Sequence, residues 1–293
     1  MAIALYTFLI LLALGLSSCA RTEQKADKNL RALAPVQFAL NQINKSDAAS
    51  AYKSRDILFD LDSSGLKDQE YVIKLAKNKV LVRGGDDIGL MYGGLEIAEQ
   101  LELYGEIKAC SGSPFIKRRG IKFNIPLDAR TPSYDDSGDA AQENIAEMWS
   151  WDFWEEFLDQ MALHRYNVLS LWNPHPFPSM IKMEEYPEIA LDDVYRTTLK
   201  PEGLENEWGD PGLVTSNVVA NLEMVVQMSI DEKISFWQKV MQYAADRGID
   251  IYWINWNICP NSVAPPVKPA IRCHQPRWKL SAWDRNGRRA DCG

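Results

Sequence analysis

The pattern of apolar and polar positions in the first part of the chain predicts a small α/β unit. An apolar run within residues 56–62 is typical of a short buried strand. The stretches 71–75 and 79–83 flank a polar turn and predict a hairpin. After a Gly-Gly-Asp-Asp turn that offers a helix N-cap, apolar residues recur at helical spacing, at Ile88, Met91, Leu95, Ala98 and Leu101. We therefore expect a sheet that is covered on one side by a helix.

The pattern changes after residue 116 and predicts three parallel strands joined by helices. Residues 121–127 alternate and end at Asp128, residues 167–172 are a continuous apolar strand, and residues 249–256 are a third strand. The helices between them begin at Ser150 and at a Ser229–Glu232 capping box. Their expected apolar faces are Trp151, Trp154, Leu158, Met161 and Ala162, and Ile230, Ile234, Trp237, Met241 and Ala244. This alternation is the rhythm of a parallel sheet with right-handed crossovers.

A long connection, residues 173–228, leaves the second of these strands. Connections of this length are usually functional or disordered, and this one follows the carboxyl end of a strand, where barrel enzymes build their sites. Its acidic residues are so dense that they indicate a solvated stretch and not an acid–base pair; they are Glu184, Glu185, Glu188, Asp192 and Asp193.

The first nineteen residues have the pattern of an export signal. A fourteen-residue apolar run, residues 3–16, is too short for a comfortable membrane span and is followed by Ser17-Ser18-Cys19. Small residues before a Cys resemble the lipobox of bacterial lipoproteins; an ordinary secretory signal that contains a Cys is the alternative. The resemblance implies lipidation of Cys19, export to the periplasm or cell surface, and anchoring to the outer membrane. Residues 20–35 are polar and lack a clear period, which favours a tether.

Charge and cysteine spacing exclude several partners. The net charge is −8, and residues 261–293 contribute +5, which leaves −13 for residues 1–260. An acidic body argues against nucleic-acid binding. The cysteines lack C-x-x-C spacing, so we predict no metal site and no cofactor.

Residues 258–293 break the earlier pattern. Five prolines lie between positions 260 and 276, the charge changes sign, and no periodicity remains. The segment is either a genuine basic arm or the product of a shifted reading frame or truncation. A complete barrel needs eight strands and about 250 residues, so we expect this chain to stop before the later strands.

Several motifs resemble glycoside hydrolases of families 20 and 67. They are Tyr71-Val72-Ile73, Val80-Leu81-Val82, Asp86-Asp87-Ile88-Gly89-Leu90-Met91-Tyr92-Gly93, Arg118-Arg119-Gly120, and Asp159-Gln160-Met161-Ala162-Leu163 with Tyr166-Asn167-Val168-Leu169. The resemblance implies an α/β fold with a small α/β sandwich domain, residues 36–116, followed by the first three units of a (β/α)8 TIM barrel, residues 117–257. It implies hydrolysis of O-glycosidic bonds in the full-length relative, with hexosaminidase-like or α-glucuronidase-like specificity.

The catalytic acids of both families lie on strand four and beyond, so their positions in this chain are unknown and we expect this chain to be inactive. Two departures weaken the transfer of substrate-binding residues: Arg130 lies three positions late, and Asn124 replaces an Asp.

Residues just beyond the predicted strand ends are the candidates for binding a polysaccharide or oligosaccharide. Asn, His and Arg side chains hydrogen-bond sugar hydroxyls or a uronate carboxylate, and Trp stacks on a sugar ring. Loop polarity and capping explain the same residues without a function. The alternative class is a non-catalytic, lipid-anchored carbohydrate-binding or scaffold protein. The candidates are Asp128, Arg130, Asn173, His175, Asn255, Trp256 and Asn257.

Overall fold

The computed structural model describes residues 27–46, 57–76, 78–131, 142–199 and 216–255. The first part of the chain forms a four-stranded sheet of order β1-β3-β2-β4, in which β1 pairs with β3 in parallel and the other pairs are antiparallel. Its strands are β1 (Ile57–Leu61), β2 (Tyr71–Ala76), β3 (Lys79–Gly84) and β4 (Cys110–Gly112). The predicted strand and hairpin are therefore confirmed.

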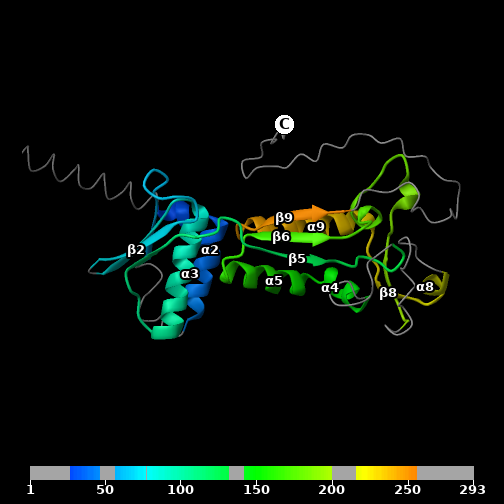
Figure 1. Ribbon diagram of the computed structural model, residues 1–293, viewed down its shortest axis with the longest axis horizontal. Helices are drawn as coiled ribbons and strands as arrows, with labels where there is room; N and C mark the ends of the chain where they lie inside the picture. Colours follow the sequence, from blue (N-terminus) through cyan, green and yellow to red (C-terminus); the bar gives the residue numbers. More distant parts are fainter. Residues whose placement is uncertain (1–26, 47–56, 77, 132–141, 200–215, 256–293) are drawn as a thin grey trace, which may run out of the picture. The chain divides into compact units, whose positions relative to one another are not determined.

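Two helices lie side by side against this sheet, α2 (Ala34–Lys45) and α3 (Asp87–Tyr104) (Figure 1). Asp86 caps α3 by accepting a hydrogen bond from the Gly89 amide, as the turn sequence predicted. Helix α2 has no counterpart among the predicted elements. It lies close to α3 because Gly94 offers no side chain: a Cβ there would lie 2.7 Å from the Ala39 Cβ.

Part of the expected tether is structured. Residues 27–31 are helical, and the Asp27 carboxylate accepts a hydrogen bond from the Phe59 amide at 2.8 Å. Arg31 pairs with Asp27 at 3.0 Å and also bonds the Ile57 carbonyl. These contacts to β1 place the end of the expected tether, residues 27–35, within the folded part of the chain.

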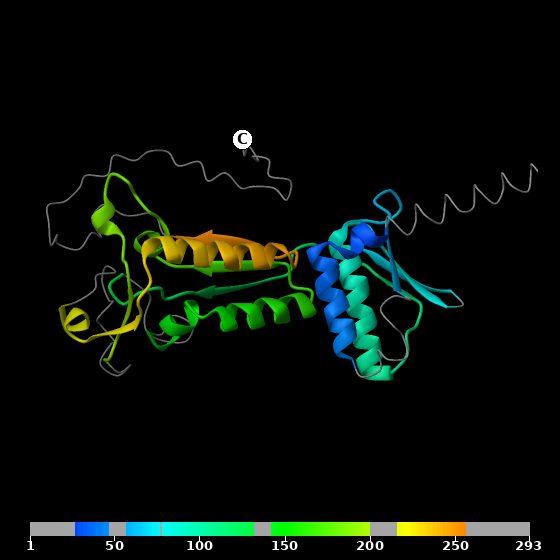
Figure 2. The same cartoon turned by 180° about the vertical axis from the view of Figure 1, so that it is seen from behind.

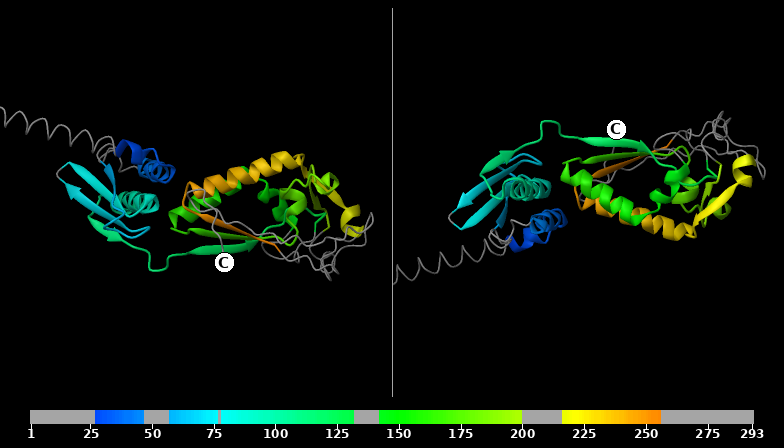
Figure 3. Two further views of the ribbon diagram at one scale, coloured as in Figure 1. Left: turned by 90° about the horizontal axis from the view of Figure 1, so that it is seen from above. Right: turned by 90° about the horizontal axis from the view of Figure 1, so that it is seen from below.

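The second sheet consists of three parallel strands in the order β5-β6-β9, and it confirms the predicted α/β class. Its strands are β5 (Gly120–Asn124), β6 (Val168–Trp172) and β9 (Asp250–Ile254). Helix α5 (Trp151–Leu163) follows β5, after the short η4 (Gln142–Asn144) and α4 (Ile145–Met148), and α9 (Ile230–Ala245) precedes β9. Figures 2 and 3 show α5 and α9 on the same side of this sheet.

The alternating stretch 121–127 becomes a shorter strand than predicted. β5 ends at Asn124, although the Ile125 amide still bonds the Trp172 carbonyl at 2.8 Å. Ile125 and Leu127 are buried in the core beyond the strand end. The chain therefore leaves the sheet early without losing its apolar alternation.

Both helix starts were predicted correctly, but the buried face of α9 was not. Ser150 caps α5, and Ser229 with Glu232 forms the full capping box of α9. Ile230, Trp237 and Ala244 are buried as expected, whereas Met241 is 38% exposed and Ile234 is half-buried. Lys233 and Val240 are buried instead. The face is rotated because Lys233 finds hydrogen-bond acceptors inside the protein, as described below.

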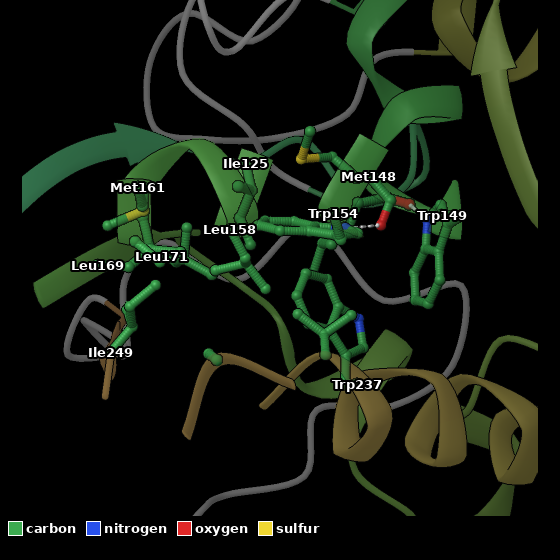
Figure 4. Close-up of a cluster of buried hydrophobic side chains, with 14 of the residues drawn as sticks. Ile125, Met148, Trp149, Trp154, Leu158, Met161, Leu169, Leu171, Trp237 and Ile249 are labelled. Carbon is green, nitrogen blue, oxygen red and sulfur yellow. Dashed lines mark hydrogen bonds between the residues drawn. The ribbon is translucent and has the colours of Figure 1, made fainter. Parts of the chain in front are cut away.

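The core behind the parallel sheet is rich in tryptophan. Trp154 is completely buried, lies 5.2 Å from Trp237 between ring centroids, and donates its indole N–H to the Met148 carbonyl at 3.0 Å (Figure 4). Leu169 and Leu171 of β6 are also completely buried in this cluster. The apolar residues predicted for α5 therefore pack on one face of the sheet.

A polar junction links the first part of the chain to the start of β5. The Arg119 guanidinium donates to the Gln69 Oε1 at 2.8 Å, to the Tyr92 hydroxyl at 3.0 Å and to the Arg165 carbonyl at 2.8 Å. Asn167 accepts from the Arg119 amide at 2.8 Å. Burial raises the pKa of Tyr92, so its hydroxyl stays protonated at neutral pH. Arg119, which the family resemblance highlighted, is therefore a structural residue.

The long connection forms its own secondary structure within residues 173–199 and 216–228. It contains α6 (Phe177–Met180), the 3-10 helix η5 (Pro187–Ile189), α8 (Ser216–Ala220) and an antiparallel pair, β7 (Val194–Thr197) with β8 (Leu222–Val226). No helix in the described residues is long and apolar enough to cross a membrane.

Candidate functional site

The carboxyl ends of the three parallel strands lie level with one another. Asn124, Trp172 and Ile254 are register partners, and each is the last residue of its strand. The ladder continues one step further, because the Asn173 amide bonds the Ile254 carbonyl at 3.1 Å. In sheets built from βαβ units, ligands bind at this edge. The segments after the three strands therefore meet at one place.

The two faces of this sheet differ in what covers them. Leu169 and Leu171 face the helices and are buried, whereas Val168, Ser170 and Trp172 alternate with them and are only half-buried. Because side chains alternate along a strand, these three residues and their register partners form the opposite face. We call this surface the open face; it consists of Gly120, Lys122, Asn124, Val168, Ser170, Trp172, Asp250, Tyr252 and Ile254.

The open face carries an aromatic and cationic group at its carboxyl end. The Lys122 Nζ lies 5.1 Å from the centroid of the Trp172 ring and donates to the Asn124 Oδ1 at 2.7 Å. Lys122 is exposed, and no carboxylate of a described residue lies within 4 Å of its ammonium group. Trp172 and Lys122 were not predicted as site residues. The signal was present, since Trp172 ends a strand in a position that alternates with buried leucines.

Asn173 and His175 follow β6, as predicted, but Asn173 is buried. Its amide group donates to the Ile125 carbonyl at 2.6 Å, and its Oδ1 accepts from the His175 amide at 2.8 Å. Asn173 therefore ties the segment after β5 to the segment after β6. Burial lowers the pKa of the half-buried His175, so its imidazole is neutral at pH 7 and offers one donor and one acceptor.

Asp128 and Arg130 are brought together after β5. The Asp128 carboxylate accepts from the Arg130 Nε and Nη2, both at 2.8 Å, and from the Arg130 amide at 2.9 Å. The Asp128 side chain is completely buried, whereas the Arg130 side chain is 23% exposed. Such a bidentate pair occupies the Asp128 carboxylate, whereas the Arg130 side chain keeps part of its surface exposed.

The connection 173–228 completes the surroundings of Arg130. The Asp193 carboxylate pairs with the Arg130 Nη2 at 2.6 Å, and the Tyr195 ring lies 4.6 Å from the guanidinium carbon. The Tyr195 amide donates to Asp128 at 3.1 Å, and its carbonyl accepts from the Ala129 amide at 2.9 Å. The start of β7 is therefore hydrogen-bonded to the segment after β5.

This arrangement corrects the prediction of a uniformly solvated acidic stretch. Glu184, Glu185 and Glu188 are exposed, as expected. Asp193, however, binds Arg130, and Asp192 accepts a hydrogen bond from the Ile230 amide at the start of α9 at 2.9 Å. The last two acidic residues of the cluster therefore serve to hold the connection in place.

The remaining predicted site residues are only partly covered. Asn255 is half-buried directly after β9. Trp256, Asn257 and the predicted lipidation site Cys19 lie outside the described residues, as does the tail, residues 258–293. Among the described His, Cys, Asp and Glu residues, no group has an arrangement that could hold a metal ion.

Comparisons with known proteins show similarity in fold. No protein-family model matches the chain, and no curated protein matches it. A solved structure of a GH138 enzyme targeting pectin rhamnogalacturonan II matches with a TM-score of 0.52 and 20% identity over 77% of this chain and 24% of that chain. A GH20 exo-β-N-acetylglucosaminidase from Vibrio harveyi matches at a TM-score of 0.41 and 13% identity, over 75% of this chain and 30% of its own. The chain thus spans about a quarter of the GH138 enzyme's length and has the fold of a glycoside hydrolase in that part.

Proposed function

We propose that this protein is an exported, carbohydrate-active protein of the glycoside hydrolase type, and that its described part binds a sugar at the carboxyl end of the open face. The observation that supports this most is Trp172, half-buried at the level strand ends with Lys122 and Asn124 beside it. The similarity in fold to a GH138 enzyme supports a parallel sheet whose carboxyl edge carries the site.

The chemistry of the site favours an acidic sugar. A sugar ring stacked on Trp172 would lie near the Lys122 ammonium group, which has no carboxylate partner among the described residues. Arg130, whose side chain is partly exposed, supplies a second cation that suits a carboxylate. We therefore infer α-glucuronidase-like recognition of a uronate unit in a polysaccharide or oligosaccharide, with hexosaminidase-like recognition of an N-acetylated sugar as the alternative.

The described residues supply binding groups and not an acid–base pair. Hydrolysis of a glycosidic bond usually needs two carboxyl groups that face the scissile bond. Asp128 is the carboxylate nearest to the predicted site along the chain, and its oxygens are occupied by Arg130 and the Tyr195 amide. We infer that hydrolysis of O-glycosidic bonds in a full-length relative depends on carboxylates outside the described residues.

The second candidate function is a non-catalytic, lipid-anchored carbohydrate-binding protein. The Asp128 carboxylate is bound by Arg130, and this is equally consistent with a non-catalytic binding protein and with the sugar-binding portion of an enzyme. Turnover by a full-length relative would separate the two, and this chain alone should be inactive under both. Incubation of the purified full chain with aryl glycosides and with oligosaccharides should release no product, and measurable release would contradict our assignment of the described strands to binding alone.

The binding proposal is tested by calorimetric titration of the full chain with trigalacturonate, galactotriose and chitotriose. We expect trigalacturonate to bind most tightly, and Trp172→Ala to abolish its heat signal. Trp151→Ala is the matched control, because Trp151 lies on α5 and packs against Tyr243 on the helix side of the sheet. Tightest binding of chitotriose would support the hexosaminidase-like alternative, and no binding of any sugar would contradict the proposal.

Export and anchoring are proposed from the sequence of residues 1–19. Diacylation of Cys19 would hold the protein at the outer membrane through its buried acyl chains. Metabolic labelling with a radioactive fatty acid in a bacterial host should mark the wild-type chain and leave Cys19→Ser unmarked and released from the membrane fraction. Labelling of the Cys19→Ser chain would contradict the lipoprotein assignment.

A further inference from the structure

Lys233 is a completely buried lysine on the inner face of α9. Its Nζ donates to the Leu191 carbonyl at 2.8 Å and to the Asp193 carbonyl at 2.6 Å, and it lies 5.3 Å from the centroid of the Trp149 ring. No carboxylate of a described residue lies within 4 Å of it. Burying an ammonium group costs free energy, so a lysine in this place calls for an explanation.

The bonds of Lys233 end on the residue that holds Arg130. The Asp193 carbonyl accepts from both the Lys233 Nζ, at 2.6 Å, and the Arg130 Nη2, at 3.0 Å. The carboxylate of the same Asp193 pairs with Nη2 at 2.6 Å. Arg130 therefore forms ion pairs with two carboxylates, Asp128 on its own segment and Asp193 on the connection.

Of these two ion pairs, only the one between Arg130 and Asp193 depends on α9. The pair with Asp128 is local, since the two residues are two positions apart. The backbone of residues 191–193 is bonded to α9 by Lys233 and by the bond from the Ile230 amide to Asp192. Removal of the lysine would take the charged donor from the Leu191 carbonyl and one of two charged donors from the Asp193 carbonyl, and would free Asp193 to move away from Arg130.

We propose that Lys233 is a positioning residue for the sugar-binding site: it fixes the guanidinium of Arg130 by holding Asp193. This inference rests on the proposed binding role of Arg130. It explains why a lysine lies on the buried face of α9, and it makes the long connection a structural part of the site.

The charge of Lys233 depends on pH, and this dependence allows its positioning role to be tested. The charged groups that face Lys233 are Asp128 and Arg130 after β5, and Asp192 and Asp193 on the connection. Burial lowers the pKa of Lys233 to about 8, against a smaller raising effect of Asp128. Loss of the charge between pH 7 and 9 weakens the bonds to both carbonyls, because charge-assisted hydrogen bonds are the stronger ones.

The test follows the guanidinium of Arg130 by NMR, with the full chain labelled with carbon-13 and nitrogen-15 at arginine and the signal assigned through Arg130→Lys. Carbon-detected spectra give the rate of rotation about the Nε–Cζ bond without interference from proton exchange. At pH 6.5 we expect slow rotation in the wild-type chain and at least tenfold faster rotation in Lys233→Met. The matched control is Lys239→Met, because Lys239 is an exposed lysine of the same helix.

A second comparison keeps the test decisive if Lys233→Met does not fold. In the wild-type chain the rotation should accelerate with a midpoint near pH 8. In Lys233→Arg, whose guanidinium keeps its charge, rotation should be slow and constant from pH 7 to 9. Equal rates in Lys233→Met and the wild-type chain, no change with pH, or the same change in Lys233→Arg would overturn the proposal.

Sugar binding separates this inference from the proposed function. If both hold, trigalacturonate should bind Lys233→Met at least threefold more weakly than it binds the wild-type chain. If the wild-type chain binds no sugar, the proposed function fails, and with it the role of Arg130 in binding. The rotation rates would still show whether Lys233 positions Arg130.

Discussion

The four-stranded sheet and the parallel sheet are covered in different ways. The four-stranded sheet is covered by α2 and α3, which contact one another at Gly94, and the core between the sheet and these helices is mainly aliphatic. The parallel sheet is covered by α5 and α9, and large aromatic rings fill the core between them, including Trp154, Trp237 and Trp253. It also has Trp172 on its open face. The same residue type therefore supports the core on one face of a sheet and offers a binding surface on the other.

This difference separates residues that maintain the fold from residues that carry the proposed function. At the amino ends of β5 and β6, polar groups such as Arg119 and Asn167 bond their neighbours and leave little for a ligand. At the carboxyl end of the parallel sheet, Lys122 is exposed and the Arg130 side chain is partly exposed. Variants that affect only one of the two sets test whether the separation is real.

The largest expected effect is on stability, from the two tryptophans on opposite faces of the parallel sheet. Trp154→Ala removes a completely buried ring and should lower the free energy of unfolding by about 3–5 kcal/mol. Trp172→Ala should lower it by less than Trp154→Ala does, because part of the Trp172 side chain is exposed. Denaturant unfolding measures both. Equal losses would show that the open face is part of a core.

The contact between α2 and α3 gives the next largest effect. Gly94→Val places a Cβ 2.7 Å from the Ala39 Cβ and should cost about 1–3 kcal/mol. Glu102→Val introduces the same side chain at an exposed position of α3 and controls for helix propensity. Thermal unfolding would show a lower Tm for Gly94→Val alone. A similar Tm in both variants would mean that the helices are less closely packed than described.

Sequence patterns predicted most of the secondary structure because the helix caps and alternating strands are local. Asp86, Ser150 and Ser229 each mark a helix start that the structure confirms. The buried face of α9 was mispredicted because the acceptors of Lys233 lie about forty residues away along the chain, at Leu191 and Asp193. Helix α2 was missed because its N-cap residue, Leu33, has no side chain that can cap the helix start.

The candidate site was predicted by position but not by orientation. Sequence identified the strand ends and hence Arg130 and His175, whose positions after β5 and β6 agree with the structure. It could not show that Asp128 and Asn173 point into the protein, since their partners are backbone groups and a guanidinium. Nor could it show that Trp172 faces away from the tryptophan core, because that depends on which face the helices cover.

A smaller effect is expected from pH through Lys233. Its pKa is about 8 in the folded protein and near 10.5 when unfolded, so between these values the unfolded chain binds more protons. The free energy of unfolding of the wild-type chain should therefore rise with pH in this window relative to Lys233→Met, by at most about 1.4 kcal/mol per pH unit. Denaturant unfolding of both chains at pH 7.5, 8.5 and 9.5 measures this difference. A difference in the free energy of unfolding that does not change with pH would contradict the lowered pKa of Lys233.

The smallest expected effect concerns charge on the open face. Lys122→Met should weaken binding of trigalacturonate by about fivefold, which corresponds to about 1 kcal/mol, and leave binding of galactotriose unchanged. The wild-type affinity for trigalacturonate should also fall with added salt, since the ammonium is exposed. Equal weakening for both sugars would show that Lys122 supports the shape of the site and does not recognise charge.

Oxidation of tryptophan by N-bromosuccinimide, read by mass spectrometry with and without trigalacturonate, tests most directly whether one face of the parallel sheet is accessible and binds sugar. We predict that Trp172 is oxidised in the free chain and protected by the sugar, while Trp154 and Trp237, which are buried, react in neither state. An unreactive Trp172, or oxidation of Trp172 to the same extent with and without the sugar, would contradict the account.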